Sequence, residues 1–104
     1  MRTLQPSELQ ALLSAQTVTL LDVRGADEWE IAHLPGALHI PMDQVPDRLD
    51  EIRAAKNLVV ICHHGIRSER VARFLERNGI DEVANLAGGL HAWAEQIDPS
   101  MPRY

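Results

Sequence analysis

The sequence has few of the residues that stabilise extracellular or membrane proteins. Cys62 is its only cysteine, which excludes an intrachain disulfide and is typical of a reducing compartment, so we expect a cytoplasmic protein. The segment Met1–Pro6 is too polar for a signal-peptide core, and no apolar run approaches the roughly 20 residues of a membrane span. The lone thiol is then either a buried hydrophobic group or a reactive one.

Basic residues are also in the minority. The chain has 10 Lys and Arg residues against 15 Asp and Glu residues, a formal net charge of -5. Nucleic-acid and anionic-membrane binding both need a basic field, so neither is expected. With 45% hydrophobic residues, a chain of 104 residues can form one core, and we expect residues 1–104 to form a single domain.

Short apolar segments alternate with segments of helical periodicity. We expect strands over residues 17–23, 37–40, 58–62 and 82–85, and helices that begin near Ser7, Ala26, Asp43, Ser68 and Leu90. This alternation predicts an α/β fold, a three-layer sandwich with a mostly parallel central sheet of about five short strands flanked by helices. Ligands of such sheets bind beyond the carboxyl ends of the strands, and Cys62 lies at one of those ends.

The segment Cys62–Ser68 carries the residue types of a nucleophilic anion site. A thiolate is stabilised by a helix N-terminus, loop amides and a nearby guanidinium. Gly65 permits the backbone angles of a tight loop whose N–H groups face an anion, and Arg67 adds a planar cationic fork. An inert core cysteine needs none of these neighbours, so we interpret Cys62 as a nucleophile.

Three motifs in order along the chain resemble those of the rhodanese-like superfamily, in particular a single-domain rhodanese. They are Leu20-Leu21-Asp22-Val23-Arg24 followed by Glu28-Trp29 and His33-Leu34-Pro35-Gly36-Ala37, the loop Cys62-His63-His64-Gly65-Ile66-Arg67-Ser68, and Gly88-Gly89-Leu90-His91-Ala92-Trp93. The resemblance extends from the first helix to about residue 97.

The resemblance implies a sulfurtransferase of the thiosulfate sulfurtransferase type. Cys62 would take a sulfane sulfur from thiosulfate or a persulfide, hold it as a persulfide, and pass it to a thiol or protein acceptor in a ping-pong cycle. The sulfur would be bound by the loop residues, which are His63, His64, Gly65, Ile66, Arg67 and Ser68, and Arg67 would also orient the donor's oxyanion. No metal or organic cofactor is implied.

Two features leave alternatives open. Thiosulfate-using rhodaneses have basic side chains after the cysteine, whereas His63 and His64 are only partly charged near neutrality, so a protein or small-molecule persulfide is the other candidate donor. Related phosphatases and arsenate reductases have the longer loop C-x5-R, and here four residues separate Cys62 from Arg67. A non-catalytic binding or sulfur-relay module on the same fold is the remaining alternative.

Other polar residues receive plainer interpretations. Asp22 and Arg24 either support the site or, as we favour, form a structural ion pair that ties the strand end to Glu28 or His33. Arg70 either helps anions approach the cysteine or belongs to a solvated helix face with Glu69 and Arg73.

The five histidines predict no metal site, because neighbouring side chains such as His63 and His64 usually diverge and the others lack ligand spacing. Trp29 and Trp93 are expected in the core.

Overall fold

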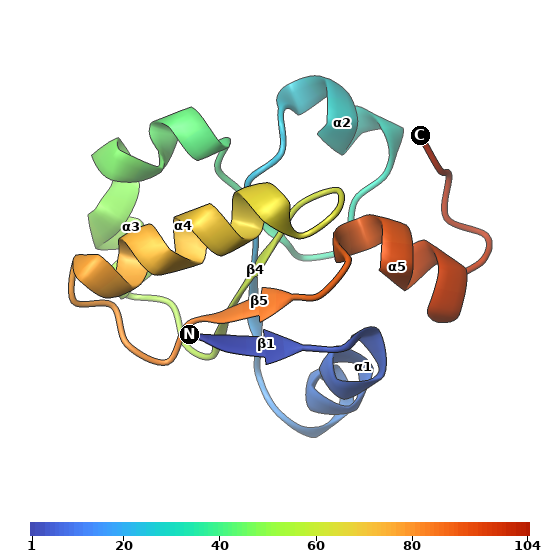
Figure 1. The fold of residues 1–104 in the computed structure, drawn as a ribbon, viewed down its shortest axis with the longest axis horizontal. Helices are drawn as coiled ribbons and strands as arrows, with labels where there is room; N and C mark the ends of the chain where they lie inside the picture. Colours follow the sequence, from blue (N-terminus) through green and yellow to red (C-terminus); the bar gives the residue numbers. More distant parts are fainter.

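The computed structural model describes residues 1–104 and alternates strands with helices throughout (Figure 1). The elements in chain order are β1 (Arg2–Leu4), α1 (Pro6–Ala15), β2 (Thr19–Asp22), α2 (Ala26–Ile31), β3 (Leu38–His39), the 3-10 helix η1 (Met42–Arg48), α3 (Leu49–Arg53), β4 (Leu58–Ile61), α4 (Ile66–Arg77), β5 (Ala84–Leu86) and α5 (Gly89–Gln96). No helix is long and apolar enough to cross a membrane.

The five strands form one sheet in the order β1-β5-β4-β2-β3, and every pair is parallel. This confirms the predicted α/β class and parallel sheet. All four residues of β4 are buried, and β4 occupies the middle of the sheet between β2 and β5. Because parallel strands share one carboxyl edge, Cys62, the residue after β4, lies at the centre of that edge.

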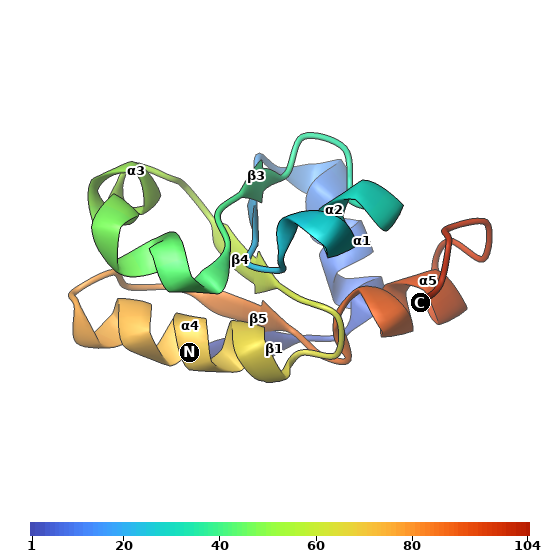
Figure 2. The same cartoon turned by 90° about the horizontal axis from the view of Figure 1, so that it is seen from above.

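Side chains that alternate along β4 divide the core into two layers, because successive residues of a strand face opposite sides of the sheet. Val60 and Cys62 pack in a cluster with Val71 and Leu75 of α4. Val59 and Ile61 pack in the other cluster, which contains Leu9 of α1, Leu90 and Trp93 of α5. Figures 1 and 2 show α3 and α4 on one side of the sheet and α1 and α5 on the other.

Three local predictions are wrong. The chain begins with an edge strand, β1, that was not expected, because only Leu4 of its three residues is buried and one buried side chain makes no pattern. Helix α1 begins at Pro6 rather than after a Ser7 cap, and the Glu8 carboxylate accepts the Gln5 N–H at 2.9 Å. Trp29 is only half-buried and stacks between His33 and His39, whereas Trp93 is buried as expected.

The start of α5 packs directly on the main chain that follows β4. The N–H groups of Leu90 and His91 donate to the carbonyls of Cys62 and His63 at 2.9 and 3.0 Å. A Cβ at Gly89 would clash with the carbonyl oxygens of Cys62 and His63, and Gly89 also has φ +60. The Gly88-Gly89 pair therefore permits a close approach of helix to sheet, as the sequence predicted.

Replacement of Gly89 by alanine is expected to lower the free energy of unfolding by more than about 2 kcal/mol, because it adds a clash with two carbonyl groups to the cost of a left-handed backbone. Gly36→Ala is the matched control, since Gly36 has φ +76 and open space around its Cβ position. It should cost about 1 kcal/mol. Urea unfolding of both variants measures the difference, and equal losses would contradict the close-approach argument.

Candidate active site

The Cys62 sulfur lies at the centre of the loop that joins β4 to α4. The thiol is 1% exposed, and its Sγ accepts the main-chain N–H groups of Gly65 at 3.1 Å and Ser68 at 3.4 Å. Gly65 makes this turn with φ +93, a left-handed conformation that glycine adopts without strain. The loop therefore directs amide donors at the sulfur, as the sequence predicted for an anion site.

Four further amides of this loop have no acceptor within the protein. The N–H groups of His63, His64, Ile66 and Arg67 make no main-chain or side-chain hydrogen bond. Unpaired main-chain donors clustered at a helix start are the basis of anion-binding nests. The loop thus has donors beyond those that hold the thiol itself.

Ser68 is part of the site, but it does not cap α4. Helix α4 starts at Ile66 with Gly65 at the capping position, which places the fully buried Ser68 in the first turn. The Cys62 thiol donates to Ser68 Oγ at 3.3 Å, and the Ser68 hydroxyl donates to Asn85 Oδ1. Asn85 in turn donates to the Gly65 carbonyl at 3.3 Å. The hydroxyl thus links the sulfur to β5.

Asn85 is a site residue that the sequence motifs did not indicate. It lies in the three-residue strand β5, where it is 5% exposed and pairs with Val60 of β4. Its position could have indicated a role, because Asn85 is the polar residue of a short, otherwise apolar strand and a buried amide needs hydrogen-bond partners.

Arg67 is paired with Glu28 rather than free. Its two terminal nitrogens donate to the two Glu28 carboxylate oxygens at 2.7 and 2.8 Å. The hydrogen bonds from Arg67 lower the pKa of Glu28 to about 2, and the hydrogen bond from Tyr104 acts in the same direction. Burial opposes this shift. The pKa of Arg67 is raised by the same pair. An incoming oxyanion would have to compete with Glu28 for the guanidinium.

Asp22 and Arg24 form a structural ion pair, both of them fully buried. Arg24 Nε donates to Asp22 Oδ1 at 2.9 Å and Nη2 donates to Oδ2 at 2.7 Å. The remaining N–H groups of Arg24 reach the carbonyls of Glu28 and Ala32 and the Tyr104 hydroxyl. The structure therefore confirms the interpretation that this ion pair ties the end of β2 to Glu28. The second contact is with Ala32 and not with His33.

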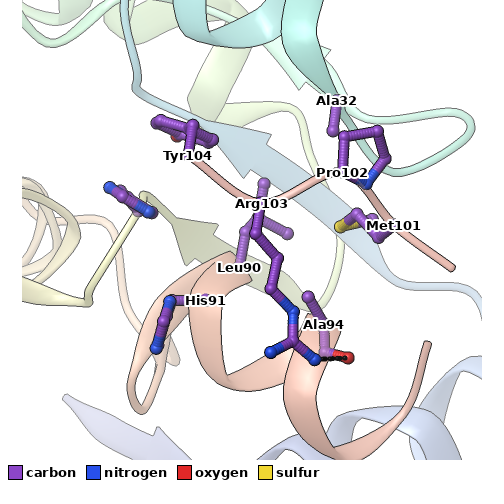
Figure 3. Close-up of a pocket in the computed structure, with 9 residues that line it drawn as sticks. Ala32, Leu90, His91, Ala94, Met101, Pro102, Arg103 and Tyr104 are labelled. Carbon is purple, nitrogen blue, oxygen red and sulfur yellow. Dashed lines mark hydrogen bonds between the residues drawn. The ribbon is translucent and has the colours of Figure 1, made fainter. Parts of the chain in front are cut away.

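Tyr104 contacts three groups at the rim of the site. Its hydroxyl accepts from Arg24 Nη1 and donates to Glu28 Oε2, both at 2.8 Å, and its ring stacks on His63 at 3.9 Å. Burial raises the pKa of Tyr104 to about 12, with the hydrogen bond to Glu28 acting in the same direction and Arg24 opposing it. Figure 3 shows the segment 101–104 facing Leu90, His91 and Ala94 of α5 across a small pocket.

The expectation that His63 and His64 diverge is wrong. Their rings tilt toward each other with centroids 4.0 Å apart, and His91 of α5 lies 5.0 Å from His64. The two residues follow β4 in a tight loop, so the alternation of a strand does not apply to them. Burial first, then the neighbouring His64, His91 and Arg67, lower the pKa of His63, with Glu28 opposing them.

The structure does not bring Arg70 to the cysteine. Arg70 is exposed and lines a separate pocket with Met42, Val45 and Phe74, between η1 and α4. Farther along α4, Arg73 pairs with Glu69 at 3.1 Å, the i,i+4 contact that the solvated-face interpretation predicted. Ile66 of the loop is 64% exposed, so its side chain contributes nothing to the enclosure of the sulfur.

The Glu28 carboxylate should make stability depend on acid pH. Because its pKa falls from 4.5 to about 2 on folding, its stabilising contribution is complete above pH 4.5 and is lost as the pH falls toward 2. The full shift corresponds to about 3 kcal/mol, and partial exposure of both side chains reduces this to about 1–2 kcal/mol. Urea unfolding of wild type and Glu28→Gln at both ends of this range measures it. A stability difference that stays constant with pH would contradict the pairing.

Comparisons with known proteins identify the family and the fold. A match to the family described as Rhodanese-like domain covers residues 5–96. The chain is 35% identical over 91 residues to the thiosulfate sulfurtransferase GlpE of Coxiella burnetii, covering 86% of this chain and 85% of that one. It is 38% identical over 89 residues to the putative sulfur carrier protein YrkF of Bacillus subtilis, covering 86% of this chain and about half (48%) of that protein.

A solved structure supports the same assignment. The crystal structure of a rhodanese-like domain protein from Staphylococcus aureus superposes with a TM-score of 0.82 at 35% identity, covering 100% of this chain and 99% of that one. Fold and sequence similarity agree, and the chain belongs to the rhodanese-like family.

Proposed function

We propose that this protein is a sulfurtransferase that carries a sulfane sulfur on Cys62. The observation that carries the proposal is the buried Cys62 sulfur, which accepts two main-chain N–H groups inside a loop with four further unpaired amides. Such a loop has donors for the thiolate and additional donors for the outer sulfur of a persulfide, which is also anionic. Similarity to the thiosulfate sulfurtransferase GlpE of Coxiella burnetii supports the same chemistry.

The cycle has two displacement steps. The Cys62 thiolate attacks the outer sulfur of the donor, forming a new S–S bond while the donor's S–S bond breaks and its electron pair leaves with the departing sulfite or thiolate. An acceptor nucleophile then attacks the outer sulfur of the Cys62 persulfide, and the Cys62 thiolate leaves. Both steps move a neutral sulfur atom between anions, so neither requires an external oxidant or reductant.

Side chains behind the loop prepare the thiol for this cycle. The Cys62 S–H donates to Ser68 Oγ, whose own proton is held by Asn85. After the thiol proton is lost, the Ser68 hydroxyl is within reach to donate to the thiolate instead. Ser68 is therefore assigned a role in stabilising the sulfur anion, and Asn85 a role in positioning Ser68.

The charges around the loop do not favour a compact dianion such as thiosulfate as the donor. The Arg67 guanidinium is occupied by Glu28, and the lowered pKa of His63 keeps that ring neutral near neutral pH. Few free cations are left for a small dianion. We propose a small-molecule or protein persulfide as the donor, with a thiol or protein as the acceptor.

Two earlier alternatives receive less support. A phosphatase of this fold needs the longer C-x5-R loop, whereas four residues separate Cys62 from Arg67 here. A non-catalytic binding module does not need an intact thiol with amide donors, and both are present. We further propose that residues 1–104 act as one rhodanese-like domain in the cytoplasm, where a lone cysteine remains reduced.

Incubation of wild-type protein with glutathione persulfide or thiosulfate should add the mass of one sulfur atom to the peptide that contains Cys62. Cys62→Ser should gain none, because a hydroxyl cannot replace the thiolate nucleophile. Intact-protein and peptide mass spectrometry measures the addition. Equal sulfur uptake by Cys62→Ser, or no uptake by the wild type from either donor, would contradict the proposal.

Ser68→Ala should lower kcat/KM for sulfur transfer by about tenfold, the value of one hydrogen bond to a charged group. Ser14→Ala is the matched control, because the Ser14 hydroxyl contacts only the Gln10 carbonyl on the exposed face of α1. Steady-state kinetics and urea unfolding of both variants separate a catalytic effect from a loss of stability. Unchanged kinetics in folded Ser68→Ala would remove Ser68 from the mechanism.

A further inference from the structure

Three histidines from two separate segments gather beside the Cys62 loop. His63 and His64 follow β4, and His91 lies in the first turn of α5. One ring nitrogen from each lies within 4.8 Å of the other two. The two displacement steps of the sulfur-transfer proposal use the main-chain N–H groups of His63 and His64, and their imidazoles take no part in making or breaking a bond.

The main chain under this cluster is firmly held. The His91 N–H donates to the His63 carbonyl at 3.0 Å, and the Leu90 N–H donates to the Cys62 carbonyl at 2.9 Å. The absence of a side chain at Gly89 lets these two segments touch. The relative positions of the three Cα atoms are therefore set by the fold, and only side-chain torsions remain adjustable.

Neighbouring groups orient two of the rings. Tyr104 stacks on His63 with ring centroids 3.9 Å apart. The Glu95 carboxylate, one turn further along α5, pairs with Nε2 of His91, which leaves Nδ1 of that ring free. A carboxylate on the far nitrogen of a histidine is the usual outer partner of a metal-ligating imidazole, since it fixes the tautomer and raises ligand basicity.

We propose that His63, His64 and His91 bind one divalent late transition-metal ion, with Zn²⁺ as the representative. Zinc–nitrogen bonds of about 2.0–2.1 Å place tetrahedral ligand atoms roughly 3.4 Å apart, so small rotations of the partly exposed rings bring nitrogens within 4.8 Å into range. Three imidazoles suit Zn²⁺, Cu²⁺ or Ni²⁺, whereas Mg²⁺ and Ca²⁺ require oxygen ligands. A set of three histidines leaves the fourth zinc position open to water or an anion.

Titration of the full chain with Zn²⁺, monitored by isothermal calorimetry, tests this site without reference to sulfur transfer. The protein should be reduced, free of any polyhistidine tag, and in a non-chelating buffer. Wild type should bind one ion, and His91→Gln and His64→Gln should each weaken binding at least tenfold, because each loses one ligand. His33→Gln is the matched control and should bind as the wild type does, since His33 lies beside Trp29 outside the cluster.

Three results would overturn the proposal. The first is the absence of saturable Zn²⁺ binding by the wild type. The second is unchanged affinity in both His91→Gln and His64→Gln, each verified as folded by circular dichroism. The third is complete loss of binding in Cys62→Ser with His91→Gln unaffected, which would place the ion on the thiol. A Co²⁺ titration adds a direct readout, because a nitrogen-ligated tetrahedral site gives visible absorption without the thiolate charge-transfer band.

Discussion

The buried guanidinium of Arg24 holds together the segments that surround the candidate site. A buried charge is costly unless all its donors are paired, and here its N–H groups reach Asp22 at the end of β2, two carbonyls of the α2 region and the hydroxyl of Tyr104. These contacts place Glu28 where its carboxylate meets Arg67 of the loop that follows Cys62. The Asp22–Arg24 ion pair thus helps to position the carboxylate that binds the Arg67 guanidinium.

The sulfur site itself is built mainly from backbone. Cys62 ends the central strand, Gly65 reverses the chain in a left-handed conformation, and Gly89 lets α5 touch the carbonyls of Cys62 and His63. Main-chain N–H groups then hold the sulfur. Because amides provide this function, the side chains after the cysteine are free to take another one. In this chain they are imidazoles that meet a third from α5.

The elements with the strongest patterns were predictable from the sequence, and the edge strand β1 was not. The apolar run Leu58–Ile61 and the helix with Val71 and Leu75 on one face bury enough side chains to show their periodicity. Strand β1 buries one residue, and it forms because β5 offers a parallel edge rather than because of any local preference. Ser68 has the residue type of a helix cap, but the left-handed Gly65 starts the helix earlier and turns the hydroxyl toward Cys62.

The α/β class, the place of Cys62 at a strand end and the size of the loop up to Arg67 could be read from the amino-acid order, because they depend on local spacing along the chain. The distant groups that meet at this loop became evident in the folded chain. Asn85 reaches Ser68, Glu28 pairs with Arg67, Tyr104 stacks on His63, and His91 joins the two loop histidines. Each of these contacts joins residues at least 17 positions apart in the chain. Their meeting follows from parallel strand order and close helix packing, which no local pattern encodes.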